Sequence, residues 1–300
     1  MVDILIVGSG PAGLTAALYG RRANKSVLVL EKNGFGGQIT FSPKIENYPG
    51  FNQVSGNELA DQLLEQVMAQ GAEVDLDEVT AIGREGDLFT VVTENGVHEA
   101  KTVIIATGAK HRLLGVPGET GFVGNGISFC AVCDGAFYTG KEVVVVGGGN
   151  SALQEAILLS DLCKSVTVVQ NLPRFTGEQK LVEQLLKKEN VKTILGATVK
   201  EFRGGDELES VVIETEAGEQ ELATDGVFVA IGLAPENGPF ADWMDLDGGG
   251  YAASDESCKT KTEGLFVAGD CRQKGVRQIT TATADGATAA LAACNYLDNK

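Results

Sequence analysis

Residues 2–13, with the sequence VDILIVGSGPAG, join an apolar run to a glycine-rich turn. A nearly continuous apolar run is typical of a strand buried in a parallel sheet. An Ala- and Leu-rich segment to about Arg22 predicts a helix, and residues 26–30 predict a second strand that ends at Glu31. Strand, GxGxxG turn, helix, strand and acid form the dinucleotide-binding fingerprint, in which the turn and helix N-terminus bind a pyrophosphate and the acid binds a ribose.

The same pattern recurs at residues 142–152, EVVVVGGGNSA, as a GxGxxA turn followed by a helix and a strand at 165–169. Residues 265–268 and an Ala-rich helix from about Thr281 to Tyr296 look like a completion of the first unit. We therefore predict an α/β fold of two Rossmann-like, three-layer dinucleotide-binding domains. The first is discontinuous, at residues 1–114 and 243–300, and the second covers 115–242, with Gly/Pro-rich junctions near 115–118 and 238–239. Residues 88–101 predict a hairpin, and residues 103–106 predict a separate strand.

Composition limits the classes of function. The 300 residues suffice for two domains, and a net charge of −17 with a pI of about 4.5 disfavours nucleic acid and anionic membranes as partners. No apolar run approaches the length of a membrane span, and Met1–Val7 reads as a strand and not as a signal peptide. Six cysteines are too sparse for a secreted disulfide framework, so we expect a cytoplasmic protein.

A CxxC motif, Cys130-Ala131-Val132-Cys133-Asp134, lies between the two glycine-rich turns. In a reducing compartment such a pair is catalytic or metal-binding. A zinc site needs two further ligands, but the other cysteines form no second CxxC and the chain has only two histidines. We therefore expect a redox-active dithiol and no metal. Asp134 is suited to donate a proton to the thiols, and a helix-capping role for the same residue would be compatible with that.

Four motifs occur in a fixed order, namely residues 8–13, 130–134, 147–152 and GLFVAGD at 264–270. In this order they resemble the low-molecular-weight thioredoxin reductases over essentially the whole chain. The resemblance implies a homodimeric FAD flavoprotein that reduces the disulfide of thioredoxin or a thioredoxin-like protein, with FAD on the first turn and NADPH on the second. It further implies that Cys133 faces the flavin, that Cys130 attacks the partner disulfide and that Asp134 donates a proton.

The resemblance also assigns the FAD-binding positions. The pyrophosphate lies on the first turn, Glu31 binds the ribose, two polar side chains bind edges of the cofactor, and the turn after residue 105 packs close to it. An acidic turn binds the ribityl chain, and the segment before the last helix lies beside the flavin ring. In chain order these residues are Gly8, Ser9, Gly10, Ala12, Gly13, Glu31, Gln38, Asn47, Ala106, Thr107, Gly108, Gly269, Asp270, Arg277, Gln278 and Ile279.

The sequence departs from the family in the segment that would bind the NADPH 2′-phosphate. Asn171, Leu172 and Thr176 stand where NADPH-dependent members carry arginines, and Arg174 is the one nearby cation. Losing charge-assisted bonds of about 1.5–3 kcal/mol each weakens NADPH binding by orders of magnitude. No acid ends this strand either, so the sequence does not favour NADH. The eroded motif resembles ferredoxin-dependent flavin thioredoxin reductases.

Three electron donors remain open: weakly bound NADPH, NADH held through Gln170 and Asn171, or a ferredoxin. We predict the ferredoxin-type donor. The negative net charge opposes it, since ferredoxins are usually acidic, and only the small basic groups at residues 110–112 and at Lys274 and Arg277 offset that charge. The retained GxGxxA turn also argues for a nucleotide. An NAD(P)H-dependent thioredoxin reductase, a dithiol oxidase of the same fold and a redox-sensing flavoprotein are the alternatives.

Overall fold

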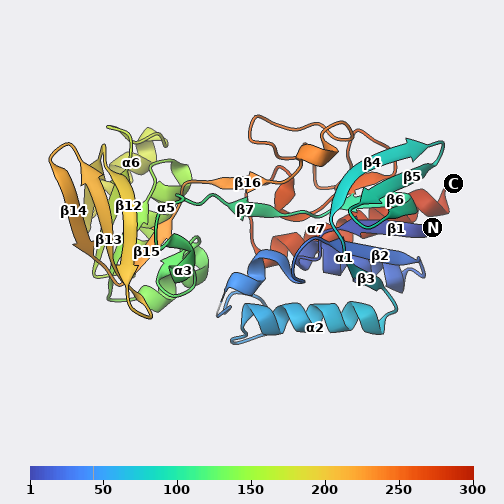
Figure 1. The fold of residues 1–300 in the computed structure, drawn as a ribbon, viewed down its shortest axis with the longest axis horizontal. Helices are drawn as coiled ribbons and strands as arrows, with labels where there is room; N and C mark the ends of the chain where they lie inside the picture. Colours follow the sequence, from blue (N-terminus) through green and yellow to red (C-terminus); the bar gives the residue numbers. More distant parts are fainter. Residues whose placement is uncertain (43) are drawn as a thin grey trace. The chain divides into compact units, whose positions relative to one another are not determined.

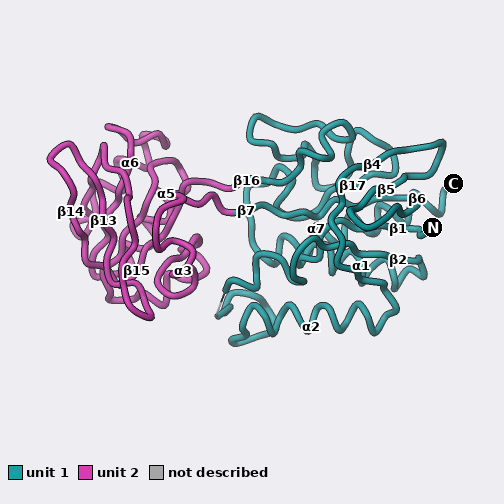
Figure 2. The backbone as a smooth tube through the Cα atoms, in the orientation of Figure 1, with its two compact units in different colours: residues 1–110, 234–300 teal, residues 111–233 magenta. Residues whose placement is uncertain are grey.

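The computed structural model describes residues 1–42 and 44–300. The chain forms two compact units, drawn in different colours in Figure 2: unit 1 is residues 1–110 with 234–300, and unit 2 is residues 111–233. The chain crosses between them twice, and the two crossing strands, β7 (Ala109–His111) and β16 (Leu233–Pro235), pair with each other (Figure 1).

The crossings lie a few residues before the boundaries expected from sequence, at 110/111 and 233/234 instead of 114/115 and 242/243. Packing explains the difference. Leu114 and Val116 already pack against the core of unit 2, whereas Phe240 is buried in unit 1 and the Trp243 indole donates to the carbonyl of Ile82 at 3.1 Å. The Gly- and Pro-rich segments are therefore turns within the units, and the crossings are the paired strands.

In unit 1 the sheet order is β3-β2-β1-β6-β5-β4, and β17 also pairs with β6. The strands with parallel neighbours are β1 (Val2–Val7), β2 (Val27–Glu31), β3 (Glu73–Leu76), β6 (Val97–Ile105) and β17 (Leu265–Val267), and the antiparallel extension is β4 (Val79–Glu85) and β5 (Leu88–Thr93). The hairpin strand and the separate strand expected at 97–101 and 103–106 are in fact one strand, β6. Its first half pairs with β5 and its second half lies between β1 and β17.

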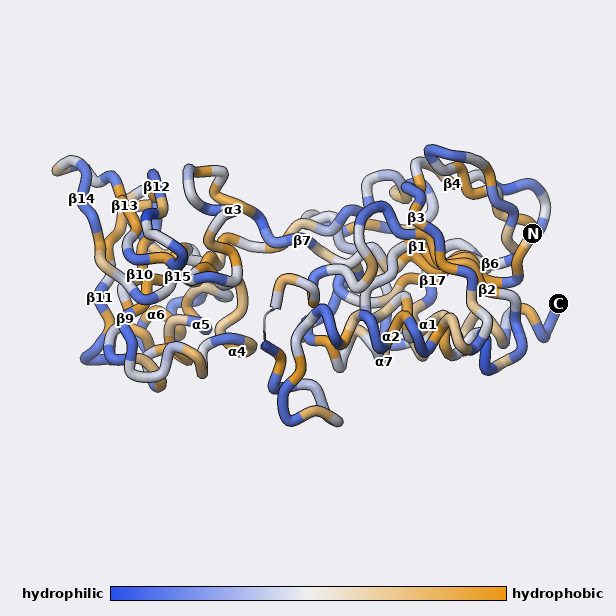
Figure 3. The backbone as a smooth tube through the Cα atoms, turned by 60° about the horizontal axis from the view of Figure 1, so that its bottom comes forward, coloured by the Kyte–Doolittle hydropathy of each residue, from blue (hydrophilic) through white to orange (hydrophobic). Residues whose placement is uncertain are grey.

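Alternate residues of this sheet face two different layers. Ile4 and Ile6 pack against helices. Leu5 and Val7, on the opposite face, pack against Trp243 and against side chains of β4 and β5, the antiparallel end of the same sheet. Figure 3 shows the strands β1, β6 and β17 as a hydrophobic centre of unit 1. The helices are α1 (Pro11–Arg22), α2 (Gly56–Ala69) and α7 (Ile279–Asp298), with 3₁₀ turns at Gly37–Phe41, Gly238–Phe240 and Gly269–Cys271.

Unit 2 repeats this plan around a parallel sheet with the order β11-β10-β9-β15-β8. Val143 and Val145 face the helices, and Val144 and Val146 face an antiparallel sheet. The parallel strands are β8 (Ile127–Ser128), β9 (Glu142–Val146), β10 (Ser165–Gln170), β11 (Val191–Leu195) and β15 (Gly226–Val229); the antiparallel strands are β12 (Thr198–Gly204), β13 (Leu208–Thr215) and β14 (Gly218–Ala223); the helices are α3 (Glu119–Phe122), α4 (Ala131–Asp134), α5 (Asn150–Ser160) and α6 (Gln179–Leu185), with a 3₁₀ turn at Gly135–Tyr138. The predicted α/β fold of two three-layer units is confirmed.

Within the described residues, no helix is both long enough and apolar enough to span a bilayer.

Candidate functional site

The first glycine-rich turn connects β1 to α1. A Cβ on Gly8, whose φ is +106°, would lie 2.4 Å from the carbonyl oxygen of Ala106, and a Cβ on Gly13 would lie 1.9 Å from the carbonyl oxygen of Gly8. Gly8 is needed for the end of β1 to lie close to the end of β6, and Gly13 is needed for α1 to lie close to the turn. A Cβ on Gly10 would meet nothing closer than 4.0 Å, so the turn is open at that point. Because Gly10 provides no side-chain cap for α1, the first backbone N–H groups of the helix are available to an anion.

Glu31, at the end of β2, is hydrogen-bonded to this turn. The amide and hydroxyl of Ser9 donate to its Oε2 at 2.8 and 2.9 Å, and the amide of Asn33 donates to Oε1 at 3.1 Å. Each carboxylate oxygen has two lone pairs, so Oε1 retains acceptor capacity for a sugar hydroxyl.

The turn after β17 lies against the same helix. A Cβ on Gly269 would come within 2.9 Å of the Ala12 Cβ, which places Asp270 beside the first turn. The Oδ1 atom of Asp270 is buried and has no hydrogen-bond partner among the described residues. Burial raises the pKa of this carboxyl, and Lys274 and Arg277 partly offset the effect. A buried oxygen without a partner marks a place where a ligand hydroxyl fits.

The remaining residues of the predicted cofactor site lie around these turns in unit 1. Asn47 donates to the Gln278 side chain at 3.1 Å, and Gln278 forms a capping box with Thr281 at the start of α7. Thr107 donates to Asn237 at 3.3 Å, and Ile279 packs beside the small core of Ile39, Ile45 and Val54. Gln38 is exposed and follows Gly37, where a Cβ would lie 3.2 Å from Gly10.

Sequence reasoning missed a buried ionic cluster that holds the Gly269–Asp270 turn. Asp285, on the buried face of α7, accepts two bonds from Arg272 at 2.7 and 2.9 Å, one from Lys274 at 2.8 Å and one from the Gly269 amide at 3.0 Å. Burial alone would raise the pKa of Asp285, but the bonds from Arg272 and Lys274 hold it below its usual value. An acid inside an otherwise Ala-rich helix was the available signal.

The small basic groups that were expected to attract an acidic donor are largely used internally. Lys110 pairs with Glu236 at 3.1 Å, Lys274 pairs with Asp285, and the Arg277 guanidinium lies 4.2 Å over the Tyr251 ring. Burial lowers the pKa of His111 to about 4, so this side chain is neutral at pH 7. Lys110 and Lys274 are therefore partly neutralised, whereas Arg112 is exposed, and an offset of the negative charge by these small groups stays a prediction.

In unit 2, Cys130 and Cys133 form a disulfide with an S–S distance of 2.12 Å. Cys130 is the N-cap of α4, and the Cys133 amide donates to its Sγ at 3.2 Å. Ser128 accepts from the Cys130 amide at 3.1 Å and donates to Asp134 Oδ2 at 2.6 Å. Burial raises the pKa of Asp134, whose Oδ1 is buried without a partner in the described part of the chain. Asp134 makes no side-chain cap bond to the 3₁₀ turn that follows it, so its possible role as a helix cap is ruled out.

The second glycine-rich turn, between β9 and α5, packs against its own chain at Gly148 but is open at Gly149, where a Cβ would meet only Thr176 Oγ1 at 3.8 Å. Gln170, at the end of β10, is 6% exposed, and a Cβ on Gly148 would lie 2.5 Å from its side chain. The Gln170 side-chain Nε2 donates to the Arg174 carbonyl at 3.4 Å, and its Oε1 accepts from the backbone N–H of Asn171 at 3.2 Å. Thr176 donates to the Gly148 carbonyl through its amide at 2.8 Å and its hydroxyl at 3.2 Å. Arg174 is exposed, makes no ion pair within residues 1–42 and 44–300, and is the single cation of the segment from Gln170 to Thr176.

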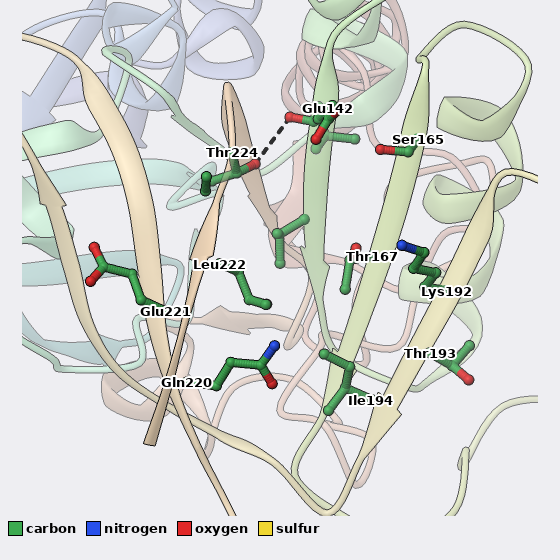
Figure 4. Close-up of a pocket in the computed structure, with 13 residues that line it drawn as sticks. Glu142, Ser165, Thr167, Lys192, Thr193, Ile194, Gln220, Glu221, Leu222 and Thr224 are labelled. Carbon is green, nitrogen blue, oxygen red and sulfur yellow. Dashed lines mark hydrogen bonds between the residues drawn. The ribbon is translucent and has the colours of Figure 1, made fainter. Parts of the chain in front are cut away.

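A groove of about 600 Å³ in unit 2 is separate from this turn. Figure 4 shows it between β14 and the strands β9, β10 and β11, with Thr224 bonded to the Glu142 carbonyl. Glu142 and Ser165 are the first residues of β9 and β10, whereas nucleotides bind at the carboxyl ends of such strands. The groove is therefore not the dinucleotide site. In the described part of the chain, no three His, Cys, Asp or Glu residues are placed to hold a metal ion.

Comparison with known proteins gives concordant results. Residues 2–286 match the pyridine nucleotide-disulphide oxidoreductase family. The chain is 42% identical to a thioredoxin reductase of Treponema pallidum, covering 99% of this chain and 97% of that protein, and 40% identical to one of Bacillus subtilis, covering 99% and 95%. The crystal structure of thioredoxin reductase from Streptococcus pyogenes matches with a TM-score of 0.95 and 43% identity, over 100% of this chain and 99% of that one.

Unit 1 fits a flavin dinucleotide through its open turn at Gly10, the hydrogen-bonded Glu31 and the unpartnered buried oxygen of Asp270. Unit 2 supplies a disulfide beside a buried acid. The chain belongs to the pyridine nucleotide-disulphide oxidoreductase family, as a thioredoxin reductase-like, FAD-dependent disulfide oxidoreductase.

Proposed function

We propose that the protein passes electrons through FAD and the Cys130–Cys133 pair to thioredoxin or a thioredoxin-like protein. The observation that carries the proposal is the Cys130–Cys133 disulfide in a chain that aligns with named thioredoxin reductases over nearly its full length. The half-buried sulfur pair adjoins Asp134, and burial raises the pKa of this carboxyl, which favours its protonated form.

FAD would be held entirely by unit 1. In our proposal the first turn binds the pyrophosphate, Glu31 binds a ribose, and Asp270 receives a hydroxyl at its unpartnered oxygen. The other contacts come from Gln38, Asn47, the turn at 106–108, and Arg277 to Ile279. When bound, FAD supplies electrons singly or in pairs, which allows either a hydride donor or a one-electron carrier to feed the disulfide.

The two cysteines have different roles in this proposal. Two electrons break the Cys130–Cys133 bond and give two thiolates. Uptake of one proton then converts one of them into a thiol, so that one thiol and one thiolate are present. The Cys133 amide points at the sulfur of Cys130 and would stabilise a thiolate there. Cys130 attacks the partner disulfide and forms a mixed disulfide, which Cys133 then resolves, while Asp134 exchanges the proton with the departing sulfur.

Trapping the mixed disulfide tests these roles without turnover. A Cys133→Ser variant retains the attacking thiol and should form a covalent complex with oxidised thioredoxin, visible by non-reducing electrophoresis. The Cys130→Ser variant is the matched control and should form little complex. A complex that forms only with Cys130→Ser would reverse the assignment, and none with either variant would argue against a thioredoxin-like partner.

For the electron donor we propose a ferredoxin-type carrier in place of NADPH. The segment from Gln170 to Thr176 supports this, because a 2′-phosphate is normally held by several guanidinium groups and the segment carries a single one, Arg174. The alternative is an NAD(P)H-dependent reductase, which the named relatives favour. Because the protein carries a net charge of −17, encounter with an acidic carrier should accelerate as salt is raised.

The donor is tested by measuring thioredoxin reduction with each donor at equal concentration. Reduced ferredoxin should support turnover, and NADPH should give a rate at least about 100-fold lower, the factor expected from a loss of roughly 3 kcal/mol of binding to its 2′-phosphate. NADH lacks that phosphate, and efficient turnover with it would also contradict the ferredoxin-type donor. Efficient turnover with NADPH would establish the alternative. Release of peroxide from oxygen with dithiols, without any thioredoxin reduction, would indicate a dithiol oxidase.

A further inference from the structure

A second carboxyl lies behind the dithiol and is not used in the roles assigned above. Glu155 is in the middle of α5, the helix against which α4 packs: Ala131 of α4 shares a buried cluster with Ala152 and Ala156. The backbone N–H of Ala131, between the two cysteines, acts on the Glu155 carboxyl and lowers its pKa, against the larger opposing effect of burial. The glutamate therefore lies on the helix that packs against the CxxC segment, between two residues, Ala152 and Ala156, of the shared cluster.

Close packing brings Asp134 near this glutamate. Gly135 follows Asp134, and a Cβ there would already lie 3.2 Å from Leu159 and 3.3 Å from Leu162, so the segment lies tightly on α5. The Oε2 atom of Glu155, like Oδ1 of Asp134, is fully buried and finds no hydrogen-bond partner among the residues that the structure describes. Two carboxyls in one buried region, each with an unbonded oxygen, are poorly suited to be ionised together.

Among the described residues, no lysine or arginine forms an ion pair with Asp134 or Glu155, and Lys141 lies over the Tyr138 ring with its Nζ 5.4 Å from the ring centre. The charged group that acts on Glu155 is Asp134, which raises the pKa of Glu155; burial is the larger cause, and together they bring it to about 7. Ser128 from β8 bonds Asp134, and Tyr138, whose pKa burial raises to about 12, is neutral. The faces of β9, β10 and α6 that pack against α5 contribute Val143, Val145, Val166, Val168 and Leu185, all apolar.

We infer that Glu155 is a positioning residue that keeps one proton shared with Asp134 beside the Cys130–Cys133 disulfide. The inference deepens the proposed function and rests on the proton-donor role of Asp134. Reduction of the disulfide takes two electrons, which the enzyme's reaction delivers, and breaks the S–S bond; the shared proton then converts the Cys133 thiolate into a thiol. The carboxyl pair is left ionised and regains its proton from solvent, so atoms and charge balance. Titration of such a pair belongs to both groups together.

The test is the pH dependence of disulfide reduction by dithiothreitol, followed in the holoenzyme by quenching and counting alkylated cysteines. This step needs neither thioredoxin nor the electron donor, so its outcome is independent of whether those partners are correctly proposed. Glu155→Gln keeps the size of the side chain and an acceptor for the Ala131 N–H but cannot hold the proton. Its rate relative to wild type should be close to 1 at pH 5.5 and should fall several-fold at pH 8.

Glu216→Gln is the matched control, because Glu216 is exposed in the turn between β13 and β14 of the same unit; its ratio should stay at 1 throughout. A Glu155→Gln ratio that is the same at every pH, whether 1 or lower, would reduce Glu155 to a structural role and overturn the inference. Should this variant fail to fold, the infrared carbonyl band of protonated carboxyls in wild type decides: it should disappear with a midpoint near pH 7, and absence of such a band would also overturn the inference.

Discussion

The two glycine-rich turns are built alike but present different chemistry. A Cβ added to Gly8 would lie 2.4 Å from the carbonyl oxygen of Ala106, which follows the neighbouring strand β6. A Cβ added to Gly147 would lie 2.5 Å from the carbonyl oxygen of Ala230, which follows the neighbouring strand β15. Backbone packing therefore demands both glycines, whether or not a nucleotide binds. The strand that follows each turn ends differently, with the acid Glu31 bonded to Ser9 of the first turn and the neutral Gln170 packed beside Gly148 of the second. The glycines therefore indicate the fold, whereas the residue at the end of the following strand indicates which ligand the turn can bind.

Removing the acid that supports the first site should have the largest effect. Asp285→Ala leaves Arg272 and Lys274 buried without their acceptor and frees the Gly269 amide, so we expect a loss of about 3–5 kcal/mol in the free energy of unfolding and loss of bound FAD. Urea unfolding and flavin content measure both. Glu263→Gln, at an exposed acid of unit 1, is the control. A variant that keeps its FAD and loses less than about 1 kcal/mol would contradict the role of the cluster.

Exchanging the third small residue of each turn should affect the two units unequally. Gly13→Ala places a methyl 1.9 Å from the Gly8 carbonyl oxygen, so a loss of about 3 kcal/mol and of bound FAD is expected. Its counterpart in the second turn is Ala152, fully buried in unit 2. Ala152→Gly should cost about 1–2 kcal/mol from helix propensity and the lost methyl, with flavin content unchanged. Equal loss of FAD in both variants would refute the assignment of the flavin to unit 1.

The buried acids of the two units should give stability opposite pH dependences. Asp285 has a lowered pKa, so its contribution is present above pH 3.8 and is lost as the pH falls through its folded-state pKa. Glu155 has a pKa raised from 4.5 to about 7, so its contribution is full below pH 4.5 and is lost as the pH rises through 7.

Glu155→Gln should therefore be more stable than wild type at pH 8, by on the order of 2 kcal/mol, and equal to it at pH 4.5. Denaturant unfolding at the two pH values measures the difference. Equal stabilisation at both would show that the effect is not due to ionisation of Glu155.

Restoring a cation to the second turn should give the smallest change. Asn171→Arg places one guanidinium after β10 and should tighten NADPH binding by about tenfold, or roughly 1.4 kcal/mol, measured by calorimetry. Asn171→Gln adds length without charge and should leave the affinity unchanged. An arginine variant that gains nothing would mean that the second unit has lost more than the phosphate contacts.

Local sequence signals predicted most of the fold because glycine turns, apolar strands and the CxxC pair are written in contiguous residues. Features that depend on distant packing were not accessible. The Asp285 cluster joins α7 to a turn after β17, and Glu155 meets the CxxC segment only because α4 packs on α5. The ion pairs of Lys110 with Glu236 and of Lys274 with Asp285 also depend on packing that the sequence does not show. Gly- and Pro-rich segments predicted turns, but not which unit each turn packs against.

The contrast between the two turns is tested most directly by mixing the oxidised holoenzyme anaerobically with excess NADPH and following the flavin absorbance. Because the second turn lacks the cations that hold a 2′-phosphate, the flavin should stay oxidised over the time in which reduced ferredoxin bleaches it fully. Rapid bleaching by NADPH would contradict the proposed donor and show that the second turn is a working nucleotide site.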